Sequence, residues 1–229
     1  GGTDSDGEPL SIPVPEGSVP VPASAAAGNA PSDGATFATA PRVPILSDRL
    51  RGSLSLRGGR IDDLALLDYR EAIAEDSPEI ILLAPTGSAH PYHAEFGWTA
   101  PPGANINLPS RGTIWSTSNS ELSPGSPVTL NWDNGDGLLF ARTYPLDDNY
   151  MISVRQQVTN RTTAQVTLFP YGLISRTGTP EVSGYIILHE GALGVFEGEL
   201  VEEDYEDMQE AKSQSFRSTG GWLGITDKY

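Results

Sequence analysis

Two of the three histidines lie close together in the segment HPYHAE, where acid–base chemistry or metal binding could take place. His93 and Glu95 are separated by one residue, so on a β-strand their side chains point to the same face. An imidazole and a carboxylate on one face could bind a metal ion or transfer protons. Pro91 separates His90 from this pair, however, and no further ligand completes a zinc motif. The pattern therefore favours the polar start of a β-strand, beside aromatic residues, over a metal or acid–base site.

The third histidine lies in ILHEGALG and is followed by a carboxylate, as in zinc proteases. The second histidine of the protease motif would fall at Leu193, and the glycines at 191 and 194 oppose the helix that the motif requires. His189 and Glu190 therefore do not form a protease site.

Neighbouring carboxylates at Asp62 and Asp63, and again at Asp147 and Asp148, suggest a glycosidase. Adjacent residues on a strand point to opposite faces, however, and acidic residues in turns usually cap the bend. We expect structural roles for both pairs. The acidic run from Glu199 to Glu210 lacks the alternating oxygens and central glycine of an EF-hand loop, so we interpret it as a solvated face rather than a calcium site.

The composition excludes several further classes of function. The absence of cysteine excludes thiol catalysis and thiolate metal sites. A formal charge of −16, from 30 acidic against 14 basic residues, repels phosphate backbones, so nucleic acid is not an expected partner. No G-x-S-x-G elbow, phosphate-binding loop or dinucleotide motif is present, and no cofactor is expected.

Apolar residues alternate with period two from Arg42 onward, as at Leu54 and Leu56, and predict half-buried β-strands. The segment DNGDG after Trp132 suits a hairpin turn. A second turn at residues 147–149 should start a strand at Tyr150. Strands and turns that recur roughly every ten residues are typical of an antiparallel sandwich or barrel.

One amphipathic helix is predicted over Val201–Lys212. Its acidic residues come early and its lysine comes last, which matches the helix dipole. Val201, Tyr205 and Met208 would share one face.

Residues 1–41 are rich in Pro, Gly and Ala, contain acidic residues, and carry no Lys or Arg. This composition predicts an extended, semi-stiff linker rather than a packed element. No run of about 18 apolar residues suggests a membrane-spanning helix. The chain does not begin with Met and carries no signal-peptide pattern, so we expect it to be a piece of a longer protein.

Several stretches together resemble the periplasmic domain of the YidC insertase family in its alphaproteobacterial form. The similarity covers most of Arg42 to Tyr229, in order. The stretches are LRGSLSLRGGRIDDLALLDYRE, HPYHAEFGW, PVTLNWDNGDGLLFARTYPLDDNYMISV, LFPYGLISRTGTPEVSGYIILHEG and FRSTGGWLGITDKY.

The resemblance implies an all-β super-sandwich of two antiparallel sheets, similar to galactose mutarotase, with a short helical segment near the C-terminal end. It implies a domain over residues 42–229 on the periplasmic side of the bacterial inner membrane. Such a domain is non-catalytic and assists the insertion and folding of membrane proteins. Its implied partners are the Sec translocon components SecD, SecF and SecYEG, and nascent membrane proteins. Insertion itself is implied to belong to transmembrane helices that this chain lacks.

The resemblance also leaves two alternatives open. A mutarotase or epimerase would need a carboxylate base and a histidine acid across a cleft, for which His93, His189 and Glu190 are candidates. A non-catalytic cleft for sugar or peptide is the other alternative, although aromatic residues on strands more often belong to the core. Such a cleft would be lined by some of Trp98, Trp115, Trp132 and Tyr144.

The closing stretch FRSTGGWLGITDKY is predicted to be the junction to a membrane domain. Two glycines allow a sharp change of direction, and apolar residues after them offer anchors. The predicted junction residues are Gly220, Gly221, Trp222, Leu223 and Tyr229.

Overall fold

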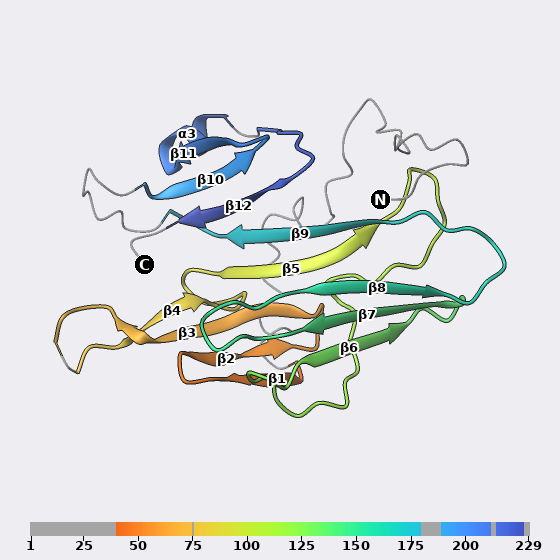
Figure 1. Ribbon diagram of the computed structural model, residues 1–229, viewed down its shortest axis with the longest axis horizontal. Coiled ribbons are helices and arrows are strands. Elements are labelled where there is room, and N and C mark those ends of the chain that lie inside the picture. The colour runs from red at the N-terminus through yellow and green to blue at the C-terminus, as the bar shows by residue number, and fades with distance from the viewer. Residues whose placement is uncertain (1–39, 75, 180–188, 212–213, 227–229) are drawn as a thin grey trace.

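The computed structural model describes residues 40–74, 76–179, 189–211 and 214–226. Nearly all of its regular structure consists of β-strands in antiparallel pairs, with one short helix near the C-terminal end of the described chain, α3 (Tyr205–Ala211) (Figure 1). The predicted all-β class with a short C-terminal helix is confirmed. The predicted linker over residues 1–41 lies outside the described residues, apart from its last two positions.

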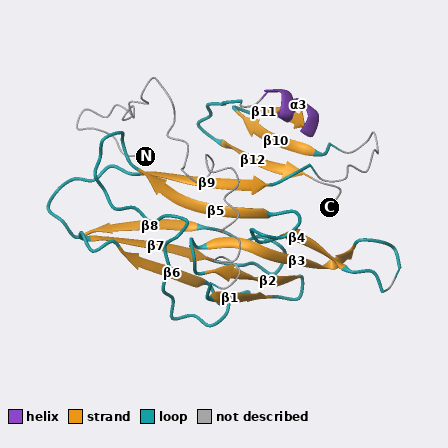
Figure 2. Ribbon diagram, turned by 180° about the vertical axis from the view of Figure 1, so that it is seen from behind, coloured by secondary structure: helices purple, strands orange, loops and turns teal. Residues whose placement is uncertain are grey.

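The largest sheet has six strands in the order β1-β2-β3-β5-β9, with β4 paired to β3 (Figure 2). The second sheet has the order β6-β7-β8. The strands of the six-stranded sheet are β1 (Arg42–Leu46), β2 (Leu50–Ser55), β3 (Arg60–Arg70), β4 (Glu79–Leu83), β5 (Tyr92–Thr99) and β9 (Phe169–Arg176). The second sheet contains β6 (Val128–Asp133), β7 (Leu138–Tyr144) and β8 (Arg155–Asn160).

A third sheet follows these two, with the order β11-β10-β12. The resemblance implied two sheets. In the described part of the chain, the C-terminal strands pair with one another rather than with β9, and this pairing creates the additional sheet. Its strands are β10 (Gly191–Phe196), β11 (Glu199–Asp204) and β12 (Gly221–Thr226).

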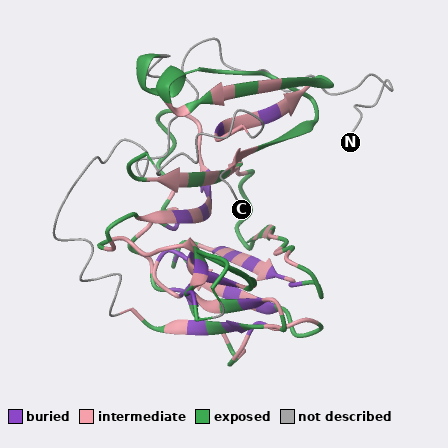
Figure 3. Ribbon diagram, turned by 90° about the vertical axis from the view of Figure 1, so that its left-hand side faces the viewer, coloured by how far each residue is buried: buried purple, intermediate pink, exposed green. Residues whose placement is uncertain are grey.

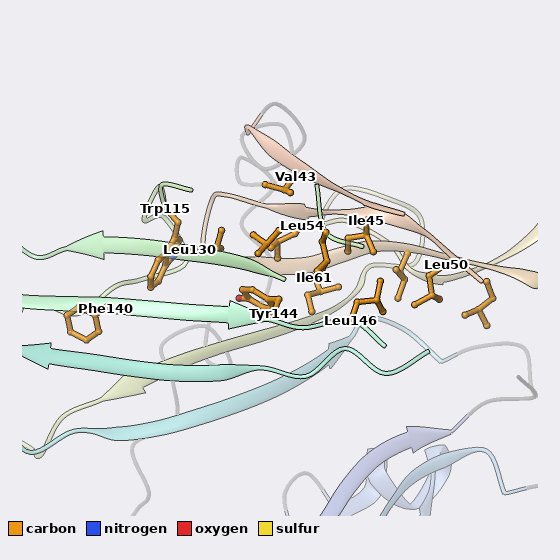
Figure 4. Close-up of a cluster of buried hydrophobic side chains, with 14 of the residues drawn as sticks. Val43, Ile45, Leu50, Leu54, Ile61, Trp115, Leu130, Phe140, Tyr144 and Leu146 are labelled. Atoms are coloured by element: carbon orange, nitrogen blue, oxygen red, sulfur yellow. The ribbon is translucent and has the colours of Figure 1, made fainter. Parts of the chain in front are cut away.

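The hydrophobic core lies between the six-stranded sheet and the β6-β7-β8 sheet (Figure 4). Leu54 and Ile61 from the first sheet are buried together with Leu130 and Phe140 from the second. Buried positions are concentrated in these two sheets, whereas the C-terminal sheet is mostly half-buried or exposed (Figure 3). The two facing sheets therefore form the packed body of the domain.

The predicted hairpin between β6 and β7 is confirmed, since Asp133 lies opposite Leu139 in an antiparallel register. Gly135 and Gly137 have φ values of 79° and 90°, which side chains other than glycine rarely adopt. The buried Asn134 Oδ1 accepts the N–H groups of Asp136 and Leu138 at 2.8 and 2.9 Å. Turn chemistry that is visible in the sequence thus produces this hairpin.

The strand predicted to start at Tyr150 starts later, at Arg155. Asp147 Oδ1 accepts the N–H groups of Asn149 and Met151, both at 2.9 Å, and so prolongs the turn. A carboxylate that satisfies nearby backbone donors competes with strand pairing.

The predicted helix over Val201–Lys212 is wrong over its first four residues, and Lys212 lies outside the described residues. Residues up to Asp204 form β11, in which Val201 lies opposite Gly194 of β10. The helix begins only at Tyr205, because Asp204 Oδ1 accepts the N–H groups of Glu206 and Asp207, both at 2.9 Å. Asp204 is therefore the N-cap of α3.

Replacement of this cap should destabilise the helix locally. We expect Asp204→Ala to weaken α3 by about 1 kcal/mol, because two backbone donors lose their acceptor. Amide hydrogen exchange over residues 205–211 should become faster. Asp204→Asn should retain protection, and Glu210→Ala serves as a control in the last turn. Unchanged exchange in Asp204→Ala would contradict the assignment of the cap.

Candidate functional site

A group of buried polar side chains lies on the six-stranded sheet, on the face opposite Ile61. Ile61 of β3 pairs with Ala94 of β5, so the residues on either side of this pair share the other face. Although this face is turned away from the hydrophobic core, its charged side chains are almost fully buried. The members next to this pair are Arg60, Asp62, His93 and Glu95.

An ion pair between Arg60 and Glu95 forms the centre of this polar cluster. Glu95 Oε2 accepts hydrogen bonds from Arg60 Nε at 3.0 Å and from Nη2 at 2.8 Å. Both side chains are only 5% exposed. Because Arg60 already occupies the carboxylate, Glu95 is poorly placed to serve as a free base.

His93 and Glu95 do point to the same face, as the sequence predicts. His93 Nε2 lies 3.8 Å from Glu95 Oε2, and Nδ1 has no hydrogen-bond partner among the described residues. Burial lowers the pKa of His93 below the ordinary 6.5, and the Arg60 guanidinium lowers it further against the opposing effect of Glu95. The imidazole is therefore neutral in the folded protein near pH 7.

This environment predicts a loss of stability in acid. Because the folded state holds His93 neutral, the unfolded state binds more protons below the ordinary pKa of about 6.5. The contribution of His93 is fully present above this pH, and we expect the free energy of unfolding to decrease as the pH falls below it. Urea denaturation between about pH 5 and 7.5 measures this slope.

Replacement of His93 by Asn should reduce the slope, whereas replacement of the exposed His90 by Asn should leave it unchanged. Equal slopes in the wild type and in His93→Asn would contradict the lowered pKa.

Asp62 and Asp63 do not form a catalytic pair. Arg42 Nη2 hydrogen-bonds to Asp62 Oδ1, while Arg42 Nε donates to Ser53 Oγ at 2.7 Å. The Ser53 hydroxyl in turn donates to Asp63 Oδ2. Both carboxylates thus have local structural partners within β1, β2 and β3.

The residues considered for a mutarotase lie in separate sheets. His93 belongs to β5, whereas His189 lies two residues before β10, where its Nε2 is 3.0 Å from the carbonyl oxygen of Ala192. Glu190 lies between His189 and the start of β10. Within the described residues, no group of three or more His, Asp and Glu side chains could hold a metal ion.

Three of the four aromatic residues considered for a cleft belong to the hydrophobic core. Trp98, Trp115 and Tyr144 are at most 6% exposed, and only Trp132 is half-buried. Their main polar neighbour is Arg142, which sequence reasoning missed. Alternation along β7 could have revealed it, because Arg142 occupies an inward position between Phe140 and Tyr144.

Arg142 connects the two facing sheets. Its Nη1 donates to the carbonyl oxygens of Gly58 and Gly59 at 2.8 and 3.4 Å. The guanidinium carbon lies 4.4 Å from the ring centroid of Trp115 and 5.3 Å from that of Trp98. These contacts are typical of a structural arginine, with hydrogen bonds and cation–π stacking in the interior.

The predicted junction residues fall on or beside β12. Gly221 has a φ of 131°, and a Cβ atom there would lie 1.9 Å from the carbonyl oxygen of Val195, so only glycine fits. Trp222 and Leu223 are 54% and 67% exposed. Gly220 precedes the strand, and Tyr229 lies outside the described residues.

Comparison with known families decides the relationship of this chain. The family model of the YidC periplasmic domain matches residues 42–229. The chain belongs to the YidC periplasmic domain family. The YidC family resemblance seen in the sequence is therefore confirmed.

Relatives with the name membrane protein insertase YidC support this membership. The relative from Bradyrhizobium diazoefficiens is 51% identical over 196 residues, which cover 85% of this chain and 32% of the relative. The relative from Nitrobacter hamburgensis is 51% identical over 198 residues, covering 86% of this chain and 32% of the relative. The relative from Methylobacterium radiotolerans is 42% identical, and its match covers 100% of this chain and 39% of the relative.

The chain thus spans about a third of the length of these YidC relatives. Membership of the YidC periplasmic domain family indicates the periplasmic side of the membrane. Within the residues that the structure covers, no helix has the length and apolar character needed to cross a bilayer.

Proposed function

We propose that this chain is a non-catalytic domain that assists a membrane protein insertase through protein–protein contacts. The match to the YidC periplasmic domain over residues 42–229 is the observation that carries this proposal. The partners are components of the Sec translocon, namely SecD, SecF and SecYEG, or nascent membrane proteins. The names of the relatives support the second class of partner, since each is a membrane protein insertase.

The polar cluster supports a non-catalytic role. A sugar mutarotase needs a carboxylate that accepts a proton during the reaction. The carboxylate beside His93, that of Glu95, instead receives two hydrogen bonds from Arg60 and is only 5% exposed. Glu190, the candidate carboxylate, directly precedes β10, which belongs to a different sheet from the strand of His93. A carboxylate that is held by a buried arginine is not free to take a proton from a substrate.

Photo-crosslinking in native membranes tests the partner contacts. A photoreactive residue at Ile174 on β9 or Met208 on α3 is accessible, because these side chains are 37% and 40% exposed. We expect adducts with SecD, SecF or SecYEG, or with nascent membrane proteins. The Sec adducts should disappear in membranes depleted of the corresponding Sec component. Absence of adducts along all exposed edges would contradict a contact role.

Polarimetry tests the enzyme alternative. Freshly dissolved α-glucose or α-galactose should mutarotate at the same rate with and without the purified chain. Catalysed decay of the optical rotation that is lost in His93→Ala or His189→Ala would overturn the non-catalytic proposal.

We also propose that residues 1–41 are a linker, that residues 42–229 form the domain, and that its end is the junction to a membrane domain. The start of β1 at Arg42 and the glycine requirement at position 221 support this division. Limited proteolysis should cleave the linker and leave a fragment with the unfolding temperature of the whole chain. A fragment that unfolds at a much lower temperature would contradict the boundary.

The junction is tested separately in the full-length protein. Four extra residues between Gly220 and Gly221 should impair membrane protein insertion without changing the unfolding temperature of the domain.

A further inference from the structure

The third sheet carries a row of apolar side chains on one face. Val195 of β10 lies directly opposite Leu200 of β11 and opposite Trp222 of β12. Directly opposed residues share a face of a sheet, so the three side chains form a continuous row. Leu200 is 57% and Trp222 54% exposed. This apolar row is therefore open to solvent in the structure.

The two faces of this sheet differ in whether their apolar side chains form a continuous row. The opposite face carries Phe196, which stacks on Phe216 with 4.6 Å between the ring centroids. On the face of the apolar row, Leu200, Glu202 and Asp204 are all exposed along β11. Leu223 on the opposite face is also 67% exposed, but Gly194 separates it from Val201, so no row of three apolar side chains forms there.

Negative charge surrounds the apolar row. Residues 189–226 include nine carboxylates against two basic residues, Lys212 and Arg217, so their formal charge of −7 is a large share of the −16 of the whole chain. Glu202 of β11 lies on the same face, in the row next to the apolar row. It pairs with Leu193 of β10, which pairs in turn with Gly224 of β12. A Cβ atom at Gly224 would meet nothing within 4 Å, so the β12 end of this second row is open, two strands away from Glu202.

We propose that this face of the C-terminal sheet, with the row Leu200, Val195 and Trp222, docks a basic polypeptide segment that also presents apolar side chains. Rows on one face of a sheet are about 6.7 Å apart, so an extended partner can place an apolar side chain on the row and a Lys or Arg beside Glu202. The row contributes buried apolar area, and the carboxylates select the charge of the partner.

The charge distribution disfavours other occupants. A second copy of this chain would bring a further charge of −16 to an acidic face. Nucleic acid and anionic lipid headgroups are repelled for the same reason. The docking surface rests on the proposed role in protein contacts and specifies one site for it.

Binding of designed peptides to the purified chain tests this proposal. Two fluorescent peptides, one alternating Val with Lys and the other Val with Glu, are titrated by anisotropy. We expect the Lys peptide to bind and the Glu peptide not to bind. Added salt should weaken binding, because part of the attraction is electrostatic.

Substitutions then locate the site. Leu200→Ser with Trp222→Ser should weaken binding of the Lys peptide at least about tenfold, since two apolar contacts are lost. Glu202→Lys changes only an exposed charge and should weaken binding in the same direction. Ile73→Ser with Ile81→Ser is the matched control, because these residues are 105% and 60% exposed on and beside the β3–β4 hairpin. Circular dichroism verifies the fold of each variant.

Two results would overturn the proposal. The first is equal binding of the Lys and Glu peptides, and the second is unchanged affinity for the Lys peptide in both Glu202→Lys and Leu200→Ser with Trp222→Ser. Phosphatidylglycerol vesicles that bind through Trp222 would identify a lipid surface instead, and self-association lost in the double variant would identify a second copy. Sec or substrate crosslinks at β9 would still support the broader contact role if this face failed.

Discussion

Arg142→Ala will lower the free energy of unfolding by about 3 kcal/mol. The substitution removes the hydrogen bonds to Gly58 and Gly59 and the cation–π contacts with Trp98 and Trp115. It also leaves a cavity in the core and a buried carbonyl group without its donor. Urea denaturation at pH 7.5 measures the difference.

Two further variants separate the causes of this loss. Arg142→Met retains most of the side-chain volume and should recover part of the stability, because packing is restored without the hydrogen bonds. Arg155→Ala on β8 is the control, since this arginine is exposed, and it should change stability by no more than about 0.5 kcal/mol. An Arg142→Ala variant as stable as Arg155→Ala would show that the link between the two sheets contributes nothing.

Glu95→Ala will also destabilise the domain strongly, by about 3 to 5 kcal/mol. The substitution removes the carboxylate that accepts two hydrogen bonds from the buried Arg60, and removal of one partner from a buried ion pair is costly. The effect should exceed that of Glu79→Ala, which removes the partner of the half-exposed Arg51 and Arg70.

A double-mutant cycle measures whether Arg60 and Glu95 contribute to the free energy of unfolding as a coupled pair. Arg60→Leu combined with Glu95→Leu should be less destabilising than either single change, because no buried charge remains unpaired. Additive losses in the double variant would show that Arg60 and Glu95 act independently.

These two sites have a common consequence for function. Three side chains that could take part in catalysis are almost fully buried and contribute to the architecture instead. They are His93 and Glu95 in the polar cluster and Arg142 in the core between the two sheets. The exposed features are instead the acidic C-terminal sheet and its apolar row. This distribution fits a domain that acts through its surface rather than through an enclosed active site.

Local sequence patterns predicted the elements whose formation depends on neighbouring residues. The β6–β7 hairpin follows from DNGDG, because Asn134 satisfies two backbone donors within four residues. The shared face of His93 and Glu95 follows from the two-residue period of a strand. The helix prediction was wrong over Val201–Asp204 because the same residues can alternate as a strand, and only pairing with β10 decided between the two conformations.

The amino-acid sequence by itself determined the all-β class, the main hairpin and the relationship to YidC, since these depend on local periodicity, turn residues and ordered motifs. Only the tertiary structure decided what the polar residues do. Arg60 reaches Glu95 across 35 residues, and Arg142 reaches Gly58 across 84. Such contacts depend on strand register and on the packing of two sheets, which no short segment encodes. The possible acid–base pair of β5 is therefore a buried ion-pair cluster because of a partner that lies far away in the sequence.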